Sequence, residues 1–180
     1  MAKKNEQDAL PAVGNIYLTG FMCAGKTTAG RALARALGRP FRDSDLCLER
    51  ETGKKIRELV SNCGLRGFRA LEAALVKELS KGPGQVIALG GGVYPSRRWE
   101  GLLKRTGTVV FLRCRWPALE KRLQAARGPR PLLAGPWEQA GPRARKLYAA
   151  RLPFYRRADL TVNTAGISPE RAAELIMGKL

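Results

Sequence analysis

Residues 20–27 have the sequence Gly20-Phe21-Met22-Cys23-Ala24-Gly25-Lys26-Thr27, which fits the pattern G-x-x-x-x-G-K-[ST]. The short apolar stretch before them, residues 15–19, predicts a strand. The Ala-, Leu- and Arg-rich stretch at 26–37 predicts a helix that stops at Gly38. A strand, a glycine-rich loop and a helix in this order are the context in which the pattern holds a phosphate chain. They predict a nucleotide-binding P-loop.

This loop supplies each part of a triphosphate site. Its glycines allow the backbone to wrap around phosphates with N–H groups inward, and the following helix adds the positive end of its dipole. Lys26 is predicted to reach the β- and γ-phosphates and the Thr27 hydroxyl to ligate Mg²⁺. We therefore expect ATP as a co-substrate and Mg²⁺ as the cofactor. The expected ATP-binding residues in this region are Gly20, Met22, Cys23, Ala24, Gly25, Lys26, Thr27 and Thr28.

Beyond the loop, short apolar strands alternate with helices. Strands are predicted at 41–43, 85–89, 108–112 and 160–163, and helices at 46–52, 68–81, 117–126, 140–155 and from Pro169, with Ser168 as the N-cap. This alternation predicts an α/β fold in which a parallel sheet lies between two layers of helices. Ligands of such folds lie beyond the carboxyl ends of the strands.

Length and composition limit the chemistry. The chain has 180 residues, enough for one domain, which we expect at 15–180 after a flexible arm at 1–14. It has no histidine, and its four cysteines form no C-x-x-C pair, which argues against a zinc site and a histidine-activated nucleophile. No apolar run has the ~18 residues of a membrane helix, and residues 1–10 are polar, so we expect a cytoplasmic protein without membrane contact.

The formal net charge is +18, and it is unevenly distributed. Residues 97–157 contain 16 Lys and Arg against three acids. Such a segment is a solvated basic surface, a cleft for anionic ligands, or a nucleic-acid surface, and charge alone does not decide among them. Few aromatic residues interleave with the basic ones as stacking platforms would, which argues against nucleic acid.

Two further segments carry candidate acceptor groups. In Asp43-Ser44-Asp45, an extended chain would turn both carboxylates to one side, where one could hold the water shell of Mg²⁺ and the other an attacking hydroxyl. The alternative is a turn with an N-cap for the next helix. The triplet Gly90-Gly91-Gly92 after a strand permits close approach of a ligand to the backbone, or is only a flexible turn.

Three arginines lie beside local signatures: Arg69 in Gly-Phe-Arg, Arg130 in Arg-Pro-Leu-Leu, and Arg151 in Arg-x-Pro-x-Tyr. Together with the P-loop, the two aspartates and the glycine triplet, in this order, they resemble the shikimate kinase family over nearly the whole chain. The resemblance implies a nucleoside-monophosphate-kinase-like P-loop NTPase fold with a five-stranded parallel sheet. It implies transfer of the γ-phosphate of ATP to the 3-hydroxyl of shikimate, on the route to aromatic amino acids, by an enzyme that we expect to be a monomer.

The resemblance also assigns roles. Asp45 would hold the reacting hydroxyl and act as its base, and Asp43 would lie near Mg²⁺. Substrate-binding residues would be Asp45, Arg69, Glu72, Gly90, Gly91, Gly92 and Arg151. Arg130 would close over the phosphates with a lid at 127–136 and stabilise charge as a catalytic residue. Arg127 or Arg122 would stack on adenine, with Arg127 favoured and Pro169 on the other face, and the substrate-binding segment would span 43–72.

The chain departs from the family pattern at Leu65, where many members have an acid, and in a short segment before Arg130. A P-loop kinase for another small metabolite is the alternative function.

Overall fold

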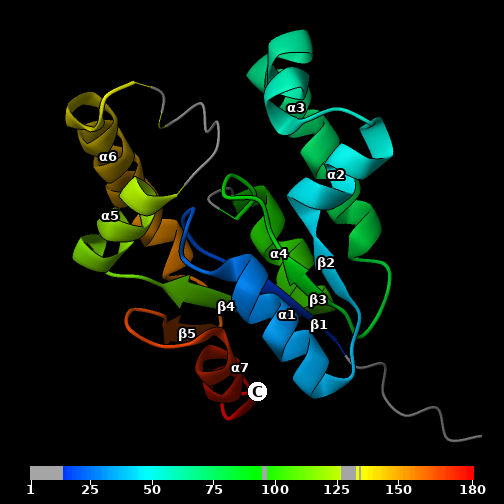
Figure 1. Ribbon diagram of the computed structural model, residues 1–180. Coiled ribbons are helices and arrows are strands. Elements are labelled where there is room, and N and C mark those ends of the chain that lie inside the picture. The colour runs from blue at the N-terminus through cyan, green and yellow to red at the C-terminus, as the bar shows by residue number, and fades with distance from the viewer. Residues whose placement is uncertain (1–13, 95–96, 127–132, 134) are drawn as a thin grey trace, which may run out of the picture.

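Five parallel strands form one sheet that separates two layers of helices (Figure 1). The computed structural model describes residues 14–94, 97–126, 133 and 135–180. The strands are β1 Asn15–Thr19, β2 Phe41–Asp43, β3 Val86–Ala88, β4 Gly107–Arg113 and β5 Leu160–Asn163. Their order in the sheet is β2-β3-β1-β4-β5, and all pairs are parallel. The predicted five-stranded parallel sheet is confirmed.

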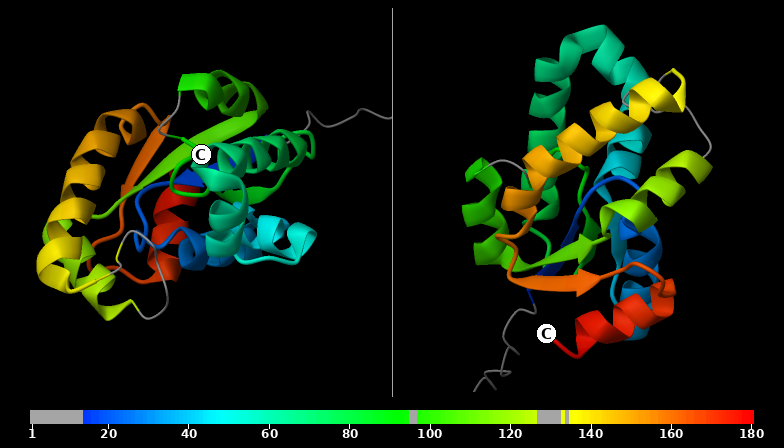
Figure 2. Two further views of the ribbon diagram at one scale, coloured as in Figure 1. Left: turned by 90° about the horizontal axis from the view of Figure 1, so that it is seen from above. Right: turned by 90° about the vertical axis from the view of Figure 1, so that its left-hand side faces the viewer.

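Seven helices connect and follow the strands in the described part of the chain. They are α1 Lys26–Leu37, α2 Ser44–Thr52, α3 Ile56–Leu79, α4 Arg97–Thr106, α5 Trp116–Ala125, α6 Trp137–Tyr155 and α7 Pro169–Met177. In the two views of Figure 2, α1 and α7 lie together on one side of the sheet, and α4 lies on the other side.

Side-chain parity along the strands explains the two layers. The side chain of Leu18 on β1 lies against Gly30 of α1, so it faces the layer of α1. Phe111 on β4 pairs with Thr19 and so faces the opposite side, where it stacks on Tyr155 at the end of α6. The core continues on both sides of the sheet because the strands are apolar at consecutive positions, as parallel strands covered on both faces require.

The strand register brings the chemically interesting segments to one edge of the sheet. Ala88 of β3 pairs with Leu18 of β1 and with Asp43 of β2. The P-loop therefore starts beside the glycine triplet after β3, and Asp43 lies beside both. Segments that are 20 to 70 residues apart in the sequence converge at the carboxyl ends of three neighbouring strands, the ligand position expected for this class of fold.

Three local predictions differ from the structure. Asp43-Ser44-Asp45 is not extended, because α2 begins at Ser44 and Asp43 is its N-cap. The helix expected at 68–81 begins already at Ile56, with a kink at Gly64, where φ is 68°. Helix α4 was not predicted. The strand at 15–19, the helix at 26–37 with its stop at Gly38, and the N-cap at Ser168 are confirmed.

Two predicted segments fall outside the described residues. The arm at 1–14 is described only at Gly14, and most of the lid at 127–136 is not described, including Arg127 and Arg130. Within the described ranges, no helix combines the length and the apolar character that crossing a bilayer requires.

Candidate active site

The P-loop has a backbone shape that only glycine permits at two positions. Gly20 has a φ of 144°, and a Cβ there would lie 2.7 Å from the carbonyl oxygen of Leu112. Gly25 has a φ of 97° and directly precedes α1. Both conformations are costly for residues with a side chain. The two fixed glycines of the sequence pattern are therefore explained by close packing and by the turn into the helix.

Lys26 lies at the junction of the loop and α1. Its Nζ donates to the carbonyl oxygens of Gly20, at 3.0 Å, and Phe21, at 3.1 Å. Burial lowers the pKa of this ammonium group, and the charges of Asp45 and Asp43 oppose the shift. The cation is thus held between the phosphate loop and the two aspartates singled out in the sequence.

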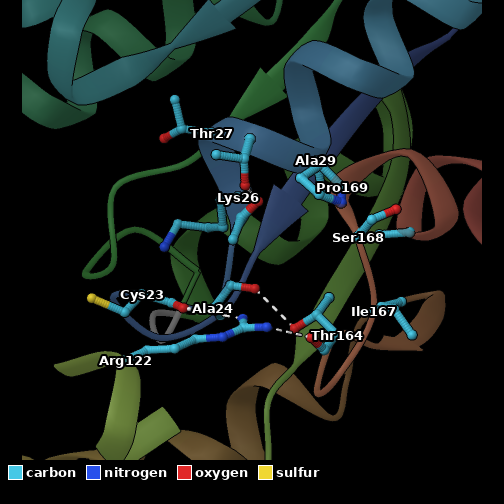
Figure 3. A pocket seen from close by; sticks show the side chains of 13 residues that line it. Cys23, Ala24, Lys26, Thr27, Ala29, Arg122, Thr164, Ile167, Ser168 and Pro169 are labelled. Atoms are coloured by element: carbon cyan, nitrogen blue, oxygen red, sulfur yellow. Dashed lines mark hydrogen bonds between the residues drawn. The ribbon is translucent and has the colours of Figure 1, made fainter. Parts of the chain in front are cut away.

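A pocket of about 410 Å³ opens beside the loop. Figure 3 shows it between the P-loop, α5 and the segment before α7. The predicted nucleotide contacts that line it are Cys23, Ala24, Gly25, Lys26, Thr27, Thr28 and Pro169. Gly20 and Met22 do not line it, since Gly20 packs against β4 and Met22 packs on the core. The remaining lining residues are Ala29, Arg122, Thr164, Ile167, Ser168 and Ala172.

Arg122 ties the two walls of this pocket together (Figure 3). Its guanidinium donates to the carbonyl oxygen of Thr164 at 2.6 Å and to that of Cys23 at 3.4 Å. The buried hydroxyl of Thr164 in turn donates to the carbonyl oxygen of Ala24 at 2.9 Å. Arg122 is one of the two arginines expected at the adenine, and Arg127, the favoured one, lies outside the described residues. Nothing in the sequence pointed to Thr164.

A hydrogen bond joins Thr27, at the start of α1, to Asp43, the N-cap of α2. The Thr27 hydroxyl donates to Oδ2 of Asp43 at 2.6 Å. The other carboxylate oxygen, Oδ1, accepts from the backbone N–H of Asp45 at 3.1 Å and of Leu46 at 3.4 Å. Asp43 is therefore both the N-cap that the sequence left as an alternative and a partner of the P-loop.

The carboxylates of Asp45 and Glu72 both lie against Gly90. A Cβ at Gly90 would be 2.6 Å from a carboxylate oxygen of each, so only glycine leaves room for both. Burial raises the pKa of Asp45 to about 6, while the charge of Lys26 lowers it and those of Asp43 and Glu72 raise it further. The N–H of Gly90 donates to the buried hydroxyl of Ser44 at 2.8 Å, which ties the end of β3 to the start of α2.

The arginines predicted to bind substrate also meet the glycine triplet. The guanidinium of Arg69 forms an ion pair with the buried Glu72 and occupies the position of a Cβ at Gly92. The guanidinium of Arg151 donates to the carbonyl oxygen of Gly91 at 2.8 Å. Asp45, Arg69, Glu72 and Arg151, predicted separately, thus gather around Gly90–Gly92, and we refer to this cluster as the candidate acceptor site.

Two residues at this site were given no role in the sequence analysis. Ser44 lies between the two aspartates, and Tyr155 ends the Arg-x-Pro-x-Tyr motif, so each was next to a recognised signal. Their hydroxyls contact the backbone of the triplet, and no pattern of side chains alone would indicate such a contact.

The fold and site define the chain as a P-loop kinase. A nucleotide pocket with a partly buried lysine adjoins a second site that contains a carboxylate of raised pKa and two arginines, which suits transfer of a phosphoryl group to an anionic acceptor.

Comparison with known proteins identifies the family. The family model described as shikimate kinase matches residues 22–180. A shikimate kinase of Thermodesulfovibrio yellowstonii is 37% identical over 91% of this chain and 92% of its own length. One of Symbiobacterium thermophilum is 43% identical, covering 80% and 82% respectively. The solved structure of shikimate kinase from Acinetobacter baumannii in complex with shikimate superposes with a TM-score of 0.85, at 38% identity, over 93% of this chain and 92% of that one.

The chain therefore belongs to the shikimate kinase family, whose members transfer the γ-phosphate of ATP to a hydroxyl of shikimate. It is an ATP-dependent phosphotransferase with an alcohol acceptor. The resemblance inferred from the sequence motifs is confirmed.

Proposed function

We propose that this chain phosphorylates the 3-hydroxyl of shikimate, with Asp45 accepting the hydroxyl proton between a lysine that holds the donor and arginines that hold the acceptor. One observation carries the proposal: the Asp45 carboxylate lies at Gly90 beside Glu72, the partner of Arg69, and is also close enough to Lys26 for that charge to lower its pKa. Phosphoryl transfer depends mainly on positioning and on neutralisation of charge, and this arrangement supports both.

The donor half binds ATP through the P-loop. Loop N–H groups and the N-terminus of α1 hold the phosphates, and Lys26 moves from the carbonyls of Gly20 and Phe21 to the β- and γ-phosphates. Arg122 and Pro169 line the far part of the pocket, where the purine lies. The catalytic role expected for Arg130 concerns the part of the chain outside the described residues.

The pair formed by Thr27 and Asp43 suits Mg²⁺, which prefers oxygen ligands and keeps several waters. Thr27 would ligate the ion directly and Asp43 through water. When bound, Mg²⁺ neutralises charge on the β- and γ-phosphates. In the described ranges no group of three or more His, Cys, Asp or Glu could hold a metal, so the phosphates and water would complete this site.

The acceptor half binds the carboxylate of shikimate. Arg69 and Arg151 reach the triplet from two different helices, and planar guanidinium groups match a carboxylate with paired hydrogen bonds. Glu72 holds Arg69 in place. Because the pKa of Asp45 is about 6, its carboxylate is mostly ionised at neutral pH and can accept the proton of the attacking hydroxyl.

The enzyme acts as a monomer in the cytoplasm. None of the four cysteines, all of which lie in the described part of the chain, forms a disulfide, the state expected in a reducing compartment.

An ADP-release assay across a panel of acceptors tests the proposal. We expect Mg²⁺-dependent ADP release with shikimate, and little with gluconate or a nucleoside monophosphate. Methyl shikimate is the sharpest control, because it keeps the 3-hydroxyl and lacks the charge that the arginines bind. Its kcat/KM should be lower by about 30-fold or more, the cost of leaving a guanidinium pair without its anion.

Turnover of other alcohols without turnover of shikimate would refute the proposed acceptor. Equal turnover of shikimate and its methyl ester would refute the role of the arginines.

A further inference from the structure

Tyr155 is a buried tyrosine at the end of α6 that the proposed reaction does not yet use. It follows Arg151 by four residues, so both side chains lie on the same face of the helix. The residue is 0% exposed, and its ring stacks on Phe111 of β4 with centroids 5.3 Å apart and an interplanar angle of 22°. The central sheet therefore fixes the ring, and the position of its hydroxyl is fixed with it.

This hydroxyl contacts the glycine triplet. It donates to the carbonyl oxygen of Gly91 at 3.1 Å, and the same oxygen accepts from Arg151 at 2.8 Å. Burial raises the pKa of Tyr155 to about 12, so the phenol remains a donor throughout the working pH range. The carbonyl of Gly91 thus accepts two hydrogen bonds. One comes from the neutral, rigidly held hydroxyl of Tyr155, and the other from the charged guanidinium of Arg151, which is also proposed to bind the substrate.

Anchoring this carbonyl fixes a second group. The described chain contains no cis peptide bond, so the C=O of Gly91 and the N–H of Gly92 point in opposite directions in one plane. With the carbonyl turned toward α6, the N–H of Gly92 points away from α6, beside the Arg69 guanidinium that packs on Gly92. Two successive glycines rotate easily, and neither has a side chain that would resist such a rotation.

We propose that Tyr155 is a positioning residue that holds the Gly91–Gly92 peptide so that the N–H of Gly92 faces the acceptor. The inference rests on the proposed function, because it assigns the acceptor to the region beside the triplet and the two arginines that contact it. Arg151 turns partly toward the substrate carboxylate when shikimate binds, and Tyr155 then keeps the peptide oriented.

The test compares Tyr155→Phe with Tyr148→Phe. Tyr148 lies on the same helix and also donates its hydroxyl to a backbone carbonyl at 3.1 Å, that of Cys114, away from the triplet. Each substitution keeps the ring and removes one hydrogen bond of the same kind. The measurements are KM and kcat for shikimate and for ATP, with the melting temperature of each variant.

We expect Tyr155→Phe to lower kcat/KM for shikimate about three- to ten-fold, the usual effect of one hydrogen bond, with KM for ATP within two-fold of wild type. Tyr148→Phe should match wild type with both substrates. A purely structural role for Tyr155 predicts that the two variants behave alike, so equal kinetics would overturn the inference. A parallel loss of ATP affinity and melting temperature in Tyr155→Phe alone would also overturn it. A wild-type enzyme that is inactive on shikimate would refute the proposed function itself.

Discussion

The nucleotide pocket and the acceptor site are built in different ways. The nucleotide pocket is lined mainly by one continuous stretch, Cys23 to Ala29, completed by Arg122 and by residues between Thr164 and Ala172. The acceptor site consists of charged side chains from α2, α3 and α6 around a glycine triplet after β3. A short motif can therefore specify the first site, whereas the second exists only once the sheet has brought distant segments together.

Charge balance also differs between the two sites. In the acceptor site, Arg69 forms an ion pair with Glu72, and the charge of Arg69 also lowers the pKa of Asp45. In the phosphate loop, Lys26 is bonded to backbone carbonyls, and burial lowers its pKa. The loop is thus specialised for a polyanion, and the acceptor site for an anion that must also lose a proton.

Removal of the loop cation should have the largest effect. Lys26→Met should lower kcat/KM by about 10³-fold or more, because a positioned cation stabilises charge on the transferring phosphate. The fold should persist, since the lost ammonium was partly desolvated. Lys81→Met removes an exposed lysine paired with Glu78 and is the matched control. Steady-state kinetics of both variants measure the effect, and near-normal turnover in Lys26→Met would remove the lysine from the mechanism.

Replacement of the proposed base should cost somewhat less. Asp45→Asn keeps the shape of the side chain and should lower kcat about 10²- to 10⁴-fold, the usual range for general-base catalysis. In the wild type, kcat/KM for shikimate should fall below pH of about 6 as Asp45 becomes protonated. A flat profile from pH 5 to 8 would contradict the assignment.

The same substitution makes a prediction about stability. The pKa of Asp45 is raised from 3.8 to about 6, so the folded chain holds this proton more tightly than the unfolded chain. Wild-type stability should therefore decrease as pH rises from about 4 to 6 and then stay at the lower level. Asparagine does not titrate, so the melting temperature of Asp45→Asn relative to wild type should rise between pH 4 and 7. Melting curves at several pH values measure this difference.

Much of the fold followed from the sequence because its strands are continuous apolar runs. Residues 15–19 and 108–112 are examples, and both form buried strands. Helix α4 was missed because its sequence is mostly polar, and it forms where Leu103, which is fully buried, packs in the core. The first part of α3 was missed because Gly64 and Gly67 are poor helix formers, and Gly64 in fact kinks the helix.

In the candidate site, the charged residues were predicted from the sequence, whereas the residues that act through backbone hydrogen bonds were not. The motifs named the charged residues, but the premise for Asp43 and Asp45 was wrong, since α2 begins between them. The carboxylates still lie near one another because the N-cap bonds of Asp43 fix the first turn of α2 against the P-loop. Ser44, Thr164 and Tyr155 act through hydrogen bonds to the backbone of other segments, and a sequence without the fold does not indicate those partners.

Calorimetric titration of Arg151→Ala tests the division between the two sites most directly. The central claim predicts that the affinity for shikimate falls about 30-fold or more, since its carboxylate loses one guanidinium partner. The affinity for a non-hydrolysable ATP analogue should stay within about two-fold of wild type, because Arg151 is not among the residues that line the nucleotide pocket. A two-fold change in affinity corresponds to only ~0.4 kcal/mol. Equal losses for both ligands, or an unchanged affinity for shikimate, would contradict the claim that separate sets of residues hold donor and acceptor.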